Sequence, residues 1–321
     1  MRDARPRRGP VARSLPAVLL ALCLLAGCRT ARTPQRNVPR ERLTSVINEL
    51  KLEEDRDIYR LPYPSDIEGR NFYEATLDRL DRWAQLHPNQ VEFLGIVSFA
   101  KGICHEKLAH LDEARGAYQA VLSAGADKGN SSKNGATRPL ADPELCRVAN
   151  ERADALNDLI GLFGPPLASV ESSAFSPREA ATARAEEAIR KYNGTRWESL
   201  SLLLAENQAV ETCLAIRASG RQSEYRAALE TLVKRFSDSK RVYSHWMRLG
   251  RYHEDVVSEW VARAEYAREP QAWKLADQAL ETATEIYLKV SQADGYPEKR
   301  EAQARLLLLE ERAREIDRHL Q

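Results

Sequence analysis

The amino-acid sequence predicts an all-α protein, built as an array of helices that turns and irregular insertions connect. From about residue 40 onward, apolar residues recur every three or four positions, and no stretch alternates apolar and polar residues as a strand does. Breakers such as Gly164-Pro165-Pro166 and Gly295-Tyr296-Pro297 stand between these periodic segments. With 43% hydrophobic and 30% charged residues, the 321-residue chain has enough apolar side chains to form a core.

The first 27 residues have the pattern of an export signal. Five arginines, opposed by Asp3 alone, precede an apolar run from Leu15 to Leu25 that is too short to span a membrane. The run ends in Leu25-Ala26-Gly27-Cys28, which resembles the lipobox of bacterial lipoproteins at all four positions. This resemblance implies cleavage after Gly27 and attachment of acyl chains such as palmitate to Cys28. An ordinary signal peptide with an accidental cysteine is the alternative.

Residues 28–40 are expected to form a flexible tether, because they contain four arginines, no acidic residue and almost no apolar side chain. Arg29 follows Cys28 where an Asp would retain a lipoprotein of a diderm bacterium in the inner membrane. The resemblance therefore implies the periplasmic face of the outer membrane, with the inner membrane as the alternative. The formal net charge of the chain, +1, argues against nucleic-acid binding through bulk charge.

Two helical domains are expected, over residues 41–163 and 177–321, with residues 164–176 as their linker. In the first domain, an apolar face from Phe72 to Leu86 ends at His87-Pro88-Asn89. A loop with many Gly, Asn and Ser residues follows at about residues 125–141. Asp142-Pro143 then has the form of an N-cap and a first-turn proline, which predicts a helix that runs to about Leu162.

In the second domain, Ser176 and Glu179 are placed to form a capping box at the start of a helix. Helices are expected over about residues 243–267 and 271–290, and a highly charged last helix over residues 298–321. On that last helix we expect a buried side and a polar side, as on the terminal helix of a solenoid. The residues expected on the buried side are Leu306, Leu307 and Leu309.

Two stretches resemble tetratricopeptide repeats, which are pairs of helices with a period of about 34 residues. One, here called the Gly102 unit, has Gly102, Ala114 and Tyr118 at the spacing of the repeat. The other, the Gly250 unit, has Trp246-Met-Arg-Leu-Gly250 followed by Ala262 and Tyr266. The resemblance covers about residues 70–125 and 195–292 and implies an α-solenoid in which the small residues allow close helix packing. An array of generic helical hairpins is the alternative, with the same architecture.

In the resembling family, ligands lie along the first helix of each unit. When these positions are transferred by register, four partner-binding residues fall in each unit. In the Gly102 unit they are Ile96, Phe99, Ile103 and Glu106, and in the Gly250 unit they are Ser244, Met247, Arg251 and Glu254. The alternative is that apolar members such as Phe99 and Ile103 pack between neighbouring repeats.

No catalytic, cofactor or metal site is expected from the motifs. His105 and His110 are five residues apart, so on one helix they would face different directions, and no CxxC pair is present. Cys104, Cys146 and Cys213 lie on apolar helical faces. We expect them to be buried free thiols, with a Cys104–Cys146 disulfide as the alternative.

Together these patterns predict a non-enzymatic scaffold, anchored by lipid on the periplasmic side of a bacterial envelope, that presents a helical surface to proteins or peptides. Helpers of outer-membrane or secretion-complex assembly are of this kind. No nucleic acid, small-molecule substrate or cofactor is expected. Two alternatives stay open. One is an enzyme that acts on peptidoglycan, or its accessory subunit, with a site in residues 125–175. The other is a structural envelope lipoprotein without a specific partner.

Overall fold

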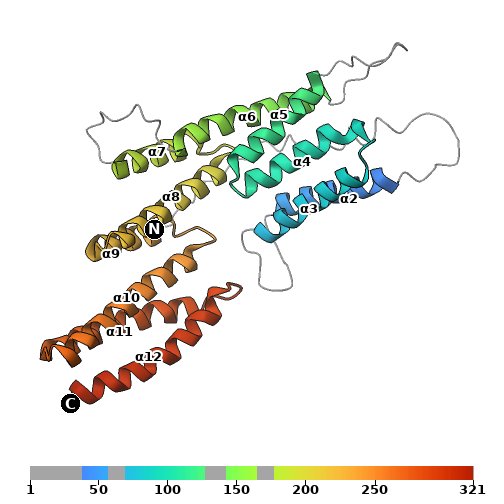
Figure 1. Cartoon of the computed structure of the whole chain (residues 1–321). Helices are drawn as coiled ribbons and strands as arrows, with labels where there is room; N and C mark the ends of the chain where they lie inside the picture. Colours follow the sequence, from blue (N-terminus) through green and yellow to red (C-terminus); the bar gives the residue numbers. More distant parts are fainter. Residues whose placement is uncertain (1–37, 57–68, 127–141, 165–176, 321) are drawn as a thin grey trace, which may run out of the picture. The chain divides into compact units, whose positions relative to one another are not determined.

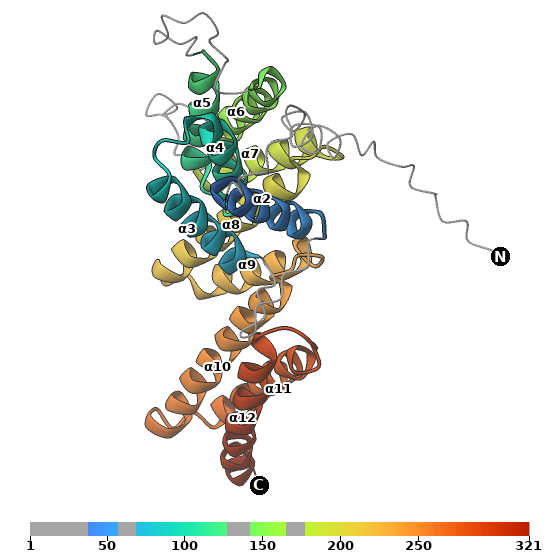
Figure 2. The same ribbon diagram turned by 90° about the vertical axis from the view of Figure 1, so that its right-hand side faces the viewer.

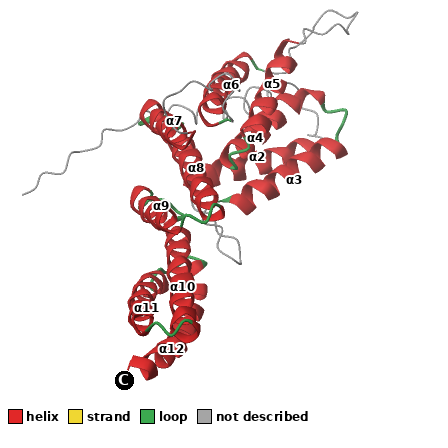
Figure 3. Ribbon diagram, turned by 60° about the vertical axis from the view of Figure 1, so that its left-hand side comes forward, coloured by secondary structure: helices red, strands yellow, loops and turns green. Residues whose placement is uncertain are grey.

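The computed structural model describes residues 38–56, 69–126, 142–164 and 177–320 (Figure 1). Within these residues the chain contains eleven α-helices, one short 3-10 helix and no strand (Figure 3). The predicted all-α class is therefore confirmed. The export signal, Cys28, Ser176 and the loop residues 127–141 and 165–176 lie outside the described residues.

The first described helix begins three residues earlier than expected, within the predicted tether. Five α-helices and one 3-10 helix form the first half of the described chain. They are α2 (Val38–Arg56), α3 (Arg70–Leu86), the 3-10 helix η1 (Val91–Phe93), α4 (Leu94–Lys107), α5 (Leu111–Ala126) and α6 (Pro143–Phe163). The helices of the second half are α7 (Pro177–Tyr192), α8 (Glu198–Ala218), α9 (Gln222–Arg235), α10 (Val242–Tyr266), α11 (Pro270–Ser291) and α12 (Glu298–Leu320).

From Leu43 onward the residues form one unit by their contacts, whereas residues up to Arg42 are grouped separately. From α3 onward, helices that follow one another in the sequence pack together, as α10, α11 and α12 do in Figure 2. One core cluster contains side chains from α2 to α8, including Leu43, Leu156 and Leu204. Buried side chains on both sides of the expected linker, residues 164–176, therefore belong to the same cluster.

The predicted start of α6 is confirmed in detail. The side chain of Asp142 accepts a hydrogen bond from the backbone N–H of Glu144 at 2.8 Å, and Pro143 occupies the first helical turn. Asp142 has an extended backbone, as an N-cap residue does, and the proline has no N–H that would need a partner.

The close packing predicted in the Gly102 unit is confirmed. A Cβ atom added at Gly102 would lie 2.5 Å from Cε1 of Tyr118, so α4 approaches α5 as closely as a glycine allows. Ala114 and Tyr118 are both fully buried on α5. The small residues thus bring the two helices together, and the tyrosine ring fills the space beside Gly102.

In the Gly250 unit the predicted partners of the glycine are wrong. Gly250, Ala262 and Tyr266 all lie on the 25-residue helix α10, and Tyr266 is 86% exposed. Gly250 instead packs on the ring of Tyr287 of α11, where its added Cβ would lie 2.6 Å from Cε1. Tyr118 follows Gly102 by 16 positions, whereas Tyr287 follows Gly250 by 37, so this hairpin is a lengthened version of the first.

The last helix also differs from its prediction in one residue. Leu309 is buried and Leu306 packs against the core, as expected, but Leu307 is 65% exposed and Leu308 is 60% exposed. Four successive leucines cover about 300° of a helix at about 100° per residue, so two of them must face away from the core. No helix in the described parts of the chain is long and apolar enough to cross a bilayer.

Candidate functional site

A row of polar side chains, three of them arginines, lies on the side of α10 that faces α8 and α12. Ser244, Arg248 and Arg251 are spaced by four and three residues, so they lie along one face of the helix. Arg241, the residue before the first helical position, begins the row.

Two arginines of this row are neutralised by neighbouring helices. Arg241 forms an ion pair with Glu206 of α8, with 2.7 Å between Nη2 and Oε2. Arg251 forms an ion pair with Glu301 of α12, with 2.6 Å between Nη2 and Oε1. The row is therefore held in place at both ends by acidic side chains.

Arg248 lies between them and forms no ion pair with a described residue. Its Nη1 atom donates to the hydroxyl of Ser244 and to Nδ1 of His245, both at 3.2 Å. Burial lowers the pKa of Arg248, and the nearby charges of Arg241 and Arg251 lower it further. An anion placed beside Arg248 would therefore relieve an unfavourable electrostatic environment.

A buried chain of hydrogen bonds fixes the orientation of Arg248. His245 is fully buried, and its Nε2 lies 2.5 Å from Oε1 of Glu206. A guanidinium can only donate, so Nδ1 of His245 accepts from Arg248 and Nε2 carries the proton that is donated to Glu206. Burial raises the pKa of Glu206, but hydrogen bonds from His245, Ser239 and Arg241 outweigh it and lower that pKa overall.

Two of the four partner-binding residues predicted in the Gly250 unit, Ser244 and Arg251, lie in this row. Met247 is 2% exposed and belongs to the core between α10, α11 and α12. Glu254 is in an ion pair with Arg305 of α12, with 2.8 Å between Oε2 and Nη1. Arg248 was not predicted, although its helical spacing from Ser244 and Arg251 was the signal that could have indicated it.

The residues predicted to bind a partner in the Gly102 unit lie mostly in the interior. Phe99, Ile103 and Glu106 are buried, and Ile96 is half-buried against the same core. Glu106 accepts a hydrogen bond from the hydroxyl of Tyr118 at 2.8 Å and pairs with Nη1 of Arg152 at 2.7 Å. A partner could touch these three side chains only if the helices separated.

Three ion pairs of one kind connect successive hairpins, and we call them the inter-hairpin ion pairs. In each, a glutamate on the first helix of one hairpin (α4, α8 or α10) pairs with an arginine of a later helix (α6, α10 or α12). The arginine lies on that helix or directly before it. The pairs are Glu106–Arg152, Glu206–Arg241 and Glu254–Arg305. Arg152 is 4% exposed, and its guanidinium also lies over the rings of Phe99 and Trp197.

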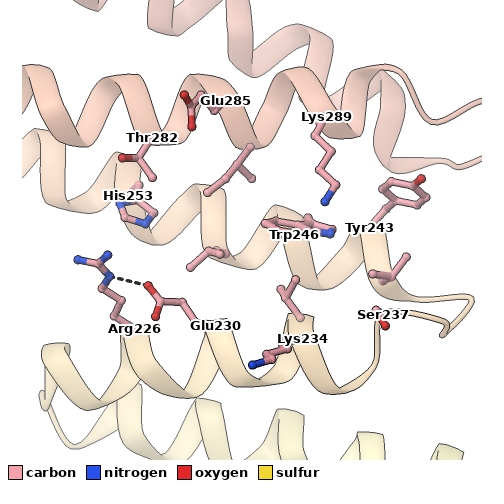
Figure 4. Close-up of a pocket in the computed structure, with 14 residues that line it drawn as sticks. Arg226, Glu230, Lys234, Ser237, Tyr243, Trp246, His253, Thr282, Glu285 and Lys289 are labelled. Atoms are coloured by element: carbon pink, nitrogen blue, oxygen red, sulfur yellow. Dashed lines mark hydrogen bonds and ion pairs between the residues drawn. The ribbon is translucent and has the colours of Figure 1, made fainter.

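A groove of about 730 Å³ lies on the other side of α10, between α9 and α11 (Figure 4). Trp246, Leu249 and His253 of α10 form its floor. Lys234 of α9 and Lys289 of α11 stand on opposite walls near the end that contains Trp246 (Figure 4). The ammonium of Lys289 is 3.9 Å from the centre of the Trp246 ring.

The cysteines and histidines of the described chain contain no candidate metal centre. No group of three or more His, Cys, Asp or Glu side chains in these residues is placed to hold a metal ion. Cys104, Cys146 and Cys213 are free thiols, so the alternative Cys104–Cys146 disulfide is not formed. Cys104 and Cys213 are buried as expected, whereas Cys146 is only partly buried. Burial, with a smaller effect from Glu54, raises the pKa of Cys104 to about 12.

Comparison with known proteins adds no family to these observations. No protein-family model matches the sequence, and no curated protein is significantly similar to it.

Proposed function

We propose that this protein is a lipid-anchored scaffold of a bacterial cell envelope, and that it binds a protein partner through Arg248. The anchor is supported by Leu25-Ala26-Gly27-Cys28 at the end of the apolar run. Binding is supported by one observation above the others. Arg248 has no acidic partner among the described residues, yet a buried network orients it.

The chemistry of this position suits a carboxylate. A guanidinium binds a carboxylate through two parallel N–H bonds, and this is stronger than a contact with a neutral group. Nη1 of Arg248 donates to Ser244 and His245. The other N–H groups of Arg248 are not among the buried polar atoms that lack a hydrogen-bond partner. The hydroxyl of Ser244 accepts from Arg248, so its own proton is available to the same ligand. The partner segment thus carries an acidic side chain or a free C-terminus.

Photo-crosslinking in cells tests this function. A photoreactive residue replaces Asp255, which is exposed and lies two turns beyond Arg248 on the same side of α10. We expect a crosslinked partner that is lost in Arg248→Gln and weakened in Arg248→Lys, because lysine keeps the charge but lacks the planar pair of donors.

The matched control is Arg190→Gln, which changes an exposed arginine on α7. This control should leave the crosslink unchanged. A crosslink that survives Arg248→Gln at wild-type intensity would show that Arg248 does not recognise the partner.

A further inference from the structure

Two surfaces of the second half of the chain have no role in the function proposed above. The first is the outer face of α12, where Leu307 and Leu308 are more than half exposed. Glu310 and Glu311 follow on exposed positions within one turn, and neither forms an ion pair with a described residue. This face is therefore apolar at its centre and acidic toward the C-terminus.

The second surface is the groove between α9 and α11, which is basic and aromatic at one end. Lys234 forms no ion pair with a described residue, and Lys289 contacts the ring of Trp246. Tyr243 and Val242 line the same end and are half-buried. At the other end, Arg226 is neutralised by Glu230 at 2.8 Å, while Glu285 has no basic partner in the described chain (Figure 4). The groove thus changes from acidic to basic along its length.

The groove has the size of a half-embedded helix. Its floor extends from Val242 to His253, about 16 Å at 1.5 Å per residue. A helix about 10 Å wide and 16 Å long has a volume of about 1,250 Å³. The groove of about 730 Å³ therefore admits a little more than half of such a helix.

The groove also favours a helix over an extended peptide. An extended segment would need partners for its own N–H and C=O groups, and the middle of the groove is lined by Val233, Leu249 and Ile286. The backbone groups of the three surrounding helices are already bonded within those helices. A helix satisfies its own backbone and needs only matching side chains.

The two surfaces lie on opposite sides of the hairpin that α10 and α11 form. The groove uses Trp246, Leu249 and His253 of α10, whereas α12 of the same chain contacts Arg251 and Glu254. A chain therefore cannot place its own α12 in its own groove. A second copy can, and the assembly then has one unoccupied groove at one end and one unoccupied α12 at the other.

We propose that this protein associates with itself head to tail, with α12 of one copy in the groove of the next. Leu307 and Leu308 then cover Trp246 and Tyr243, and Glu311 lies between Lys234 and Lys289. The basic residue Arg300, three turns earlier on α12, falls near Glu285 at the acidic end of the groove. Because the two contact surfaces differ, the contact is heterologous and continues beyond a dimer.

Sedimentation velocity of the full chain in detergent, over a concentration series, tests this proposal. The wild type should form species heavier than a monomer as concentration rises. A groove variant, Lys234→Glu with Lys289→Glu, and a helix variant, Leu307→Gln with Leu308→Gln, should each stay monomeric. Circular dichroism checks that both keep the wild-type helix content.

The mixture of the two variants is the decisive sample. The groove variant keeps an intact α12 and the helix variant keeps an intact groove, so together they should form a one-to-one dimer and nothing larger. A mixture that stays monomeric would overturn the proposal, as would a wild type that is monomeric at every concentration. Self-association in either variant alone would also overturn it.

Matched controls and a charge exchange complete the test. Lys274→Glu on α11 and the pair Leu202→Gln and Leu214→Gln on α8 change exposed residues outside both surfaces and should associate as the wild type does. Adding Glu310→Lys and Glu311→Lys to the groove variant should restore association, because both partners of the contact are then reversed in charge. This outcome is independent of Arg248, whose loss affects partner binding alone.

Discussion

Replacing Gly250 by alanine tests how closely α10 packs on α11. The new methyl carbon would lie 2.6 Å from Cε1 and 2.7 Å from Cζ of Tyr287. Carbon atoms that do not bond are most stable at about 3.5–4.0 Å, so the ring or the helix must move by about 1 Å. Tyr287 is fully buried, which leaves the ring no open space into which it can turn.

The expected loss follows from two opposing effects. Extra atoms in a packed core destabilise a protein by about 1–3 kcal/mol. Alanine in place of glycine in a helix stabilises it by about 1 kcal/mol. We therefore expect Gly250→Ala to lower the free energy of unfolding by about 1 kcal/mol. Gly116→Ala on α5 is the matched control, because no atom lies within 4 Å of its added Cβ, and it should raise that free energy by up to about 1 kcal/mol.

Urea unfolding followed by far-ultraviolet circular dichroism measures both variants. The midpoint should shift to lower urea in Gly250→Ala and to higher urea in Gly116→Ala. If Gly250→Ala is as stable as the wild type, α11 does not approach α10 as closely as the packing of Tyr287 on Gly250 requires, and the reasoning fails.

Three further changes have defined outcomes. Cys28→Ser should move the protein from the detergent phase to the aqueous phase on phase separation, because stable anchoring needs more than one acyl chain; unchanged partitioning would contradict lipidation. Arg152→Ala should lower the free energy of unfolding by about 3–5 kcal/mol, since it leaves Glu106 buried without its partner. Arg147→Ala on the same helix, at an exposed ion pair, should change it by no more than about 1 kcal/mol, and equal losses would contradict the argument. Burial, with a contribution from Arg226, lowers the pKa of His253. The unfolded chain therefore takes up the proton first, so stability should fall from about pH 7.5 to about pH 5.5, and less in His253→Gln; equal urea midpoint shifts in both proteins would refute this.

The order of the helices could be predicted because short local motifs determine where each helix begins and ends. Asp142-Pro143 and Gly295-Tyr296-Pro297 stop or start a helix through backbone geometry, which does not depend on the rest of the fold. The described helices accordingly begin and end within a few residues of the expected positions.

The pairing inside the Gly250 unit could not be predicted from repeat spacing. Ala262 and Tyr266 match the repeat by position, but no glycine or proline separates them from Gly250, so the helix continues to Tyr266. The chain turns at Arg268, whose φ of 53° is left-handed, and then restarts at Pro270. The breakers predict one helix over about residues 243–267, and the structure confirms this helix, which leaves no room for a turn between Gly250 and Ala262.

The candidate site depends on residues that are distant in the sequence. Helical spacing groups Ser244 with Arg248 and Arg251, but sequence alone cannot show which arginine meets an acid. That depends on Glu206, which is 35 residues before Arg241, and on Glu301, which is 50 residues after Arg251. Arg248 is distinguished from Arg241 and Arg251 by its lack of an acidic partner among the described residues. This difference arises only when α8, α10 and α12 are packed together.

The inter-hairpin ion pairs also determine how the array opens. In a linear array, coupling between neighbours decides whether hairpins unfold singly or together. Glu254 lies on α10 and Arg305 on α12, so fraying of α12 alone leaves the half-buried carboxylate of Glu254 without its ion-pair partner. Backbone amides of α10 and α12 should therefore exchange with solvent as one cooperative unit. Between α6 and α8 the described chain has instead a longer, partly exposed contact of Arg196 with Glu151, at 3.9 Å, so coupling across this boundary depends on the shared apolar core rather than on a buried ion pair.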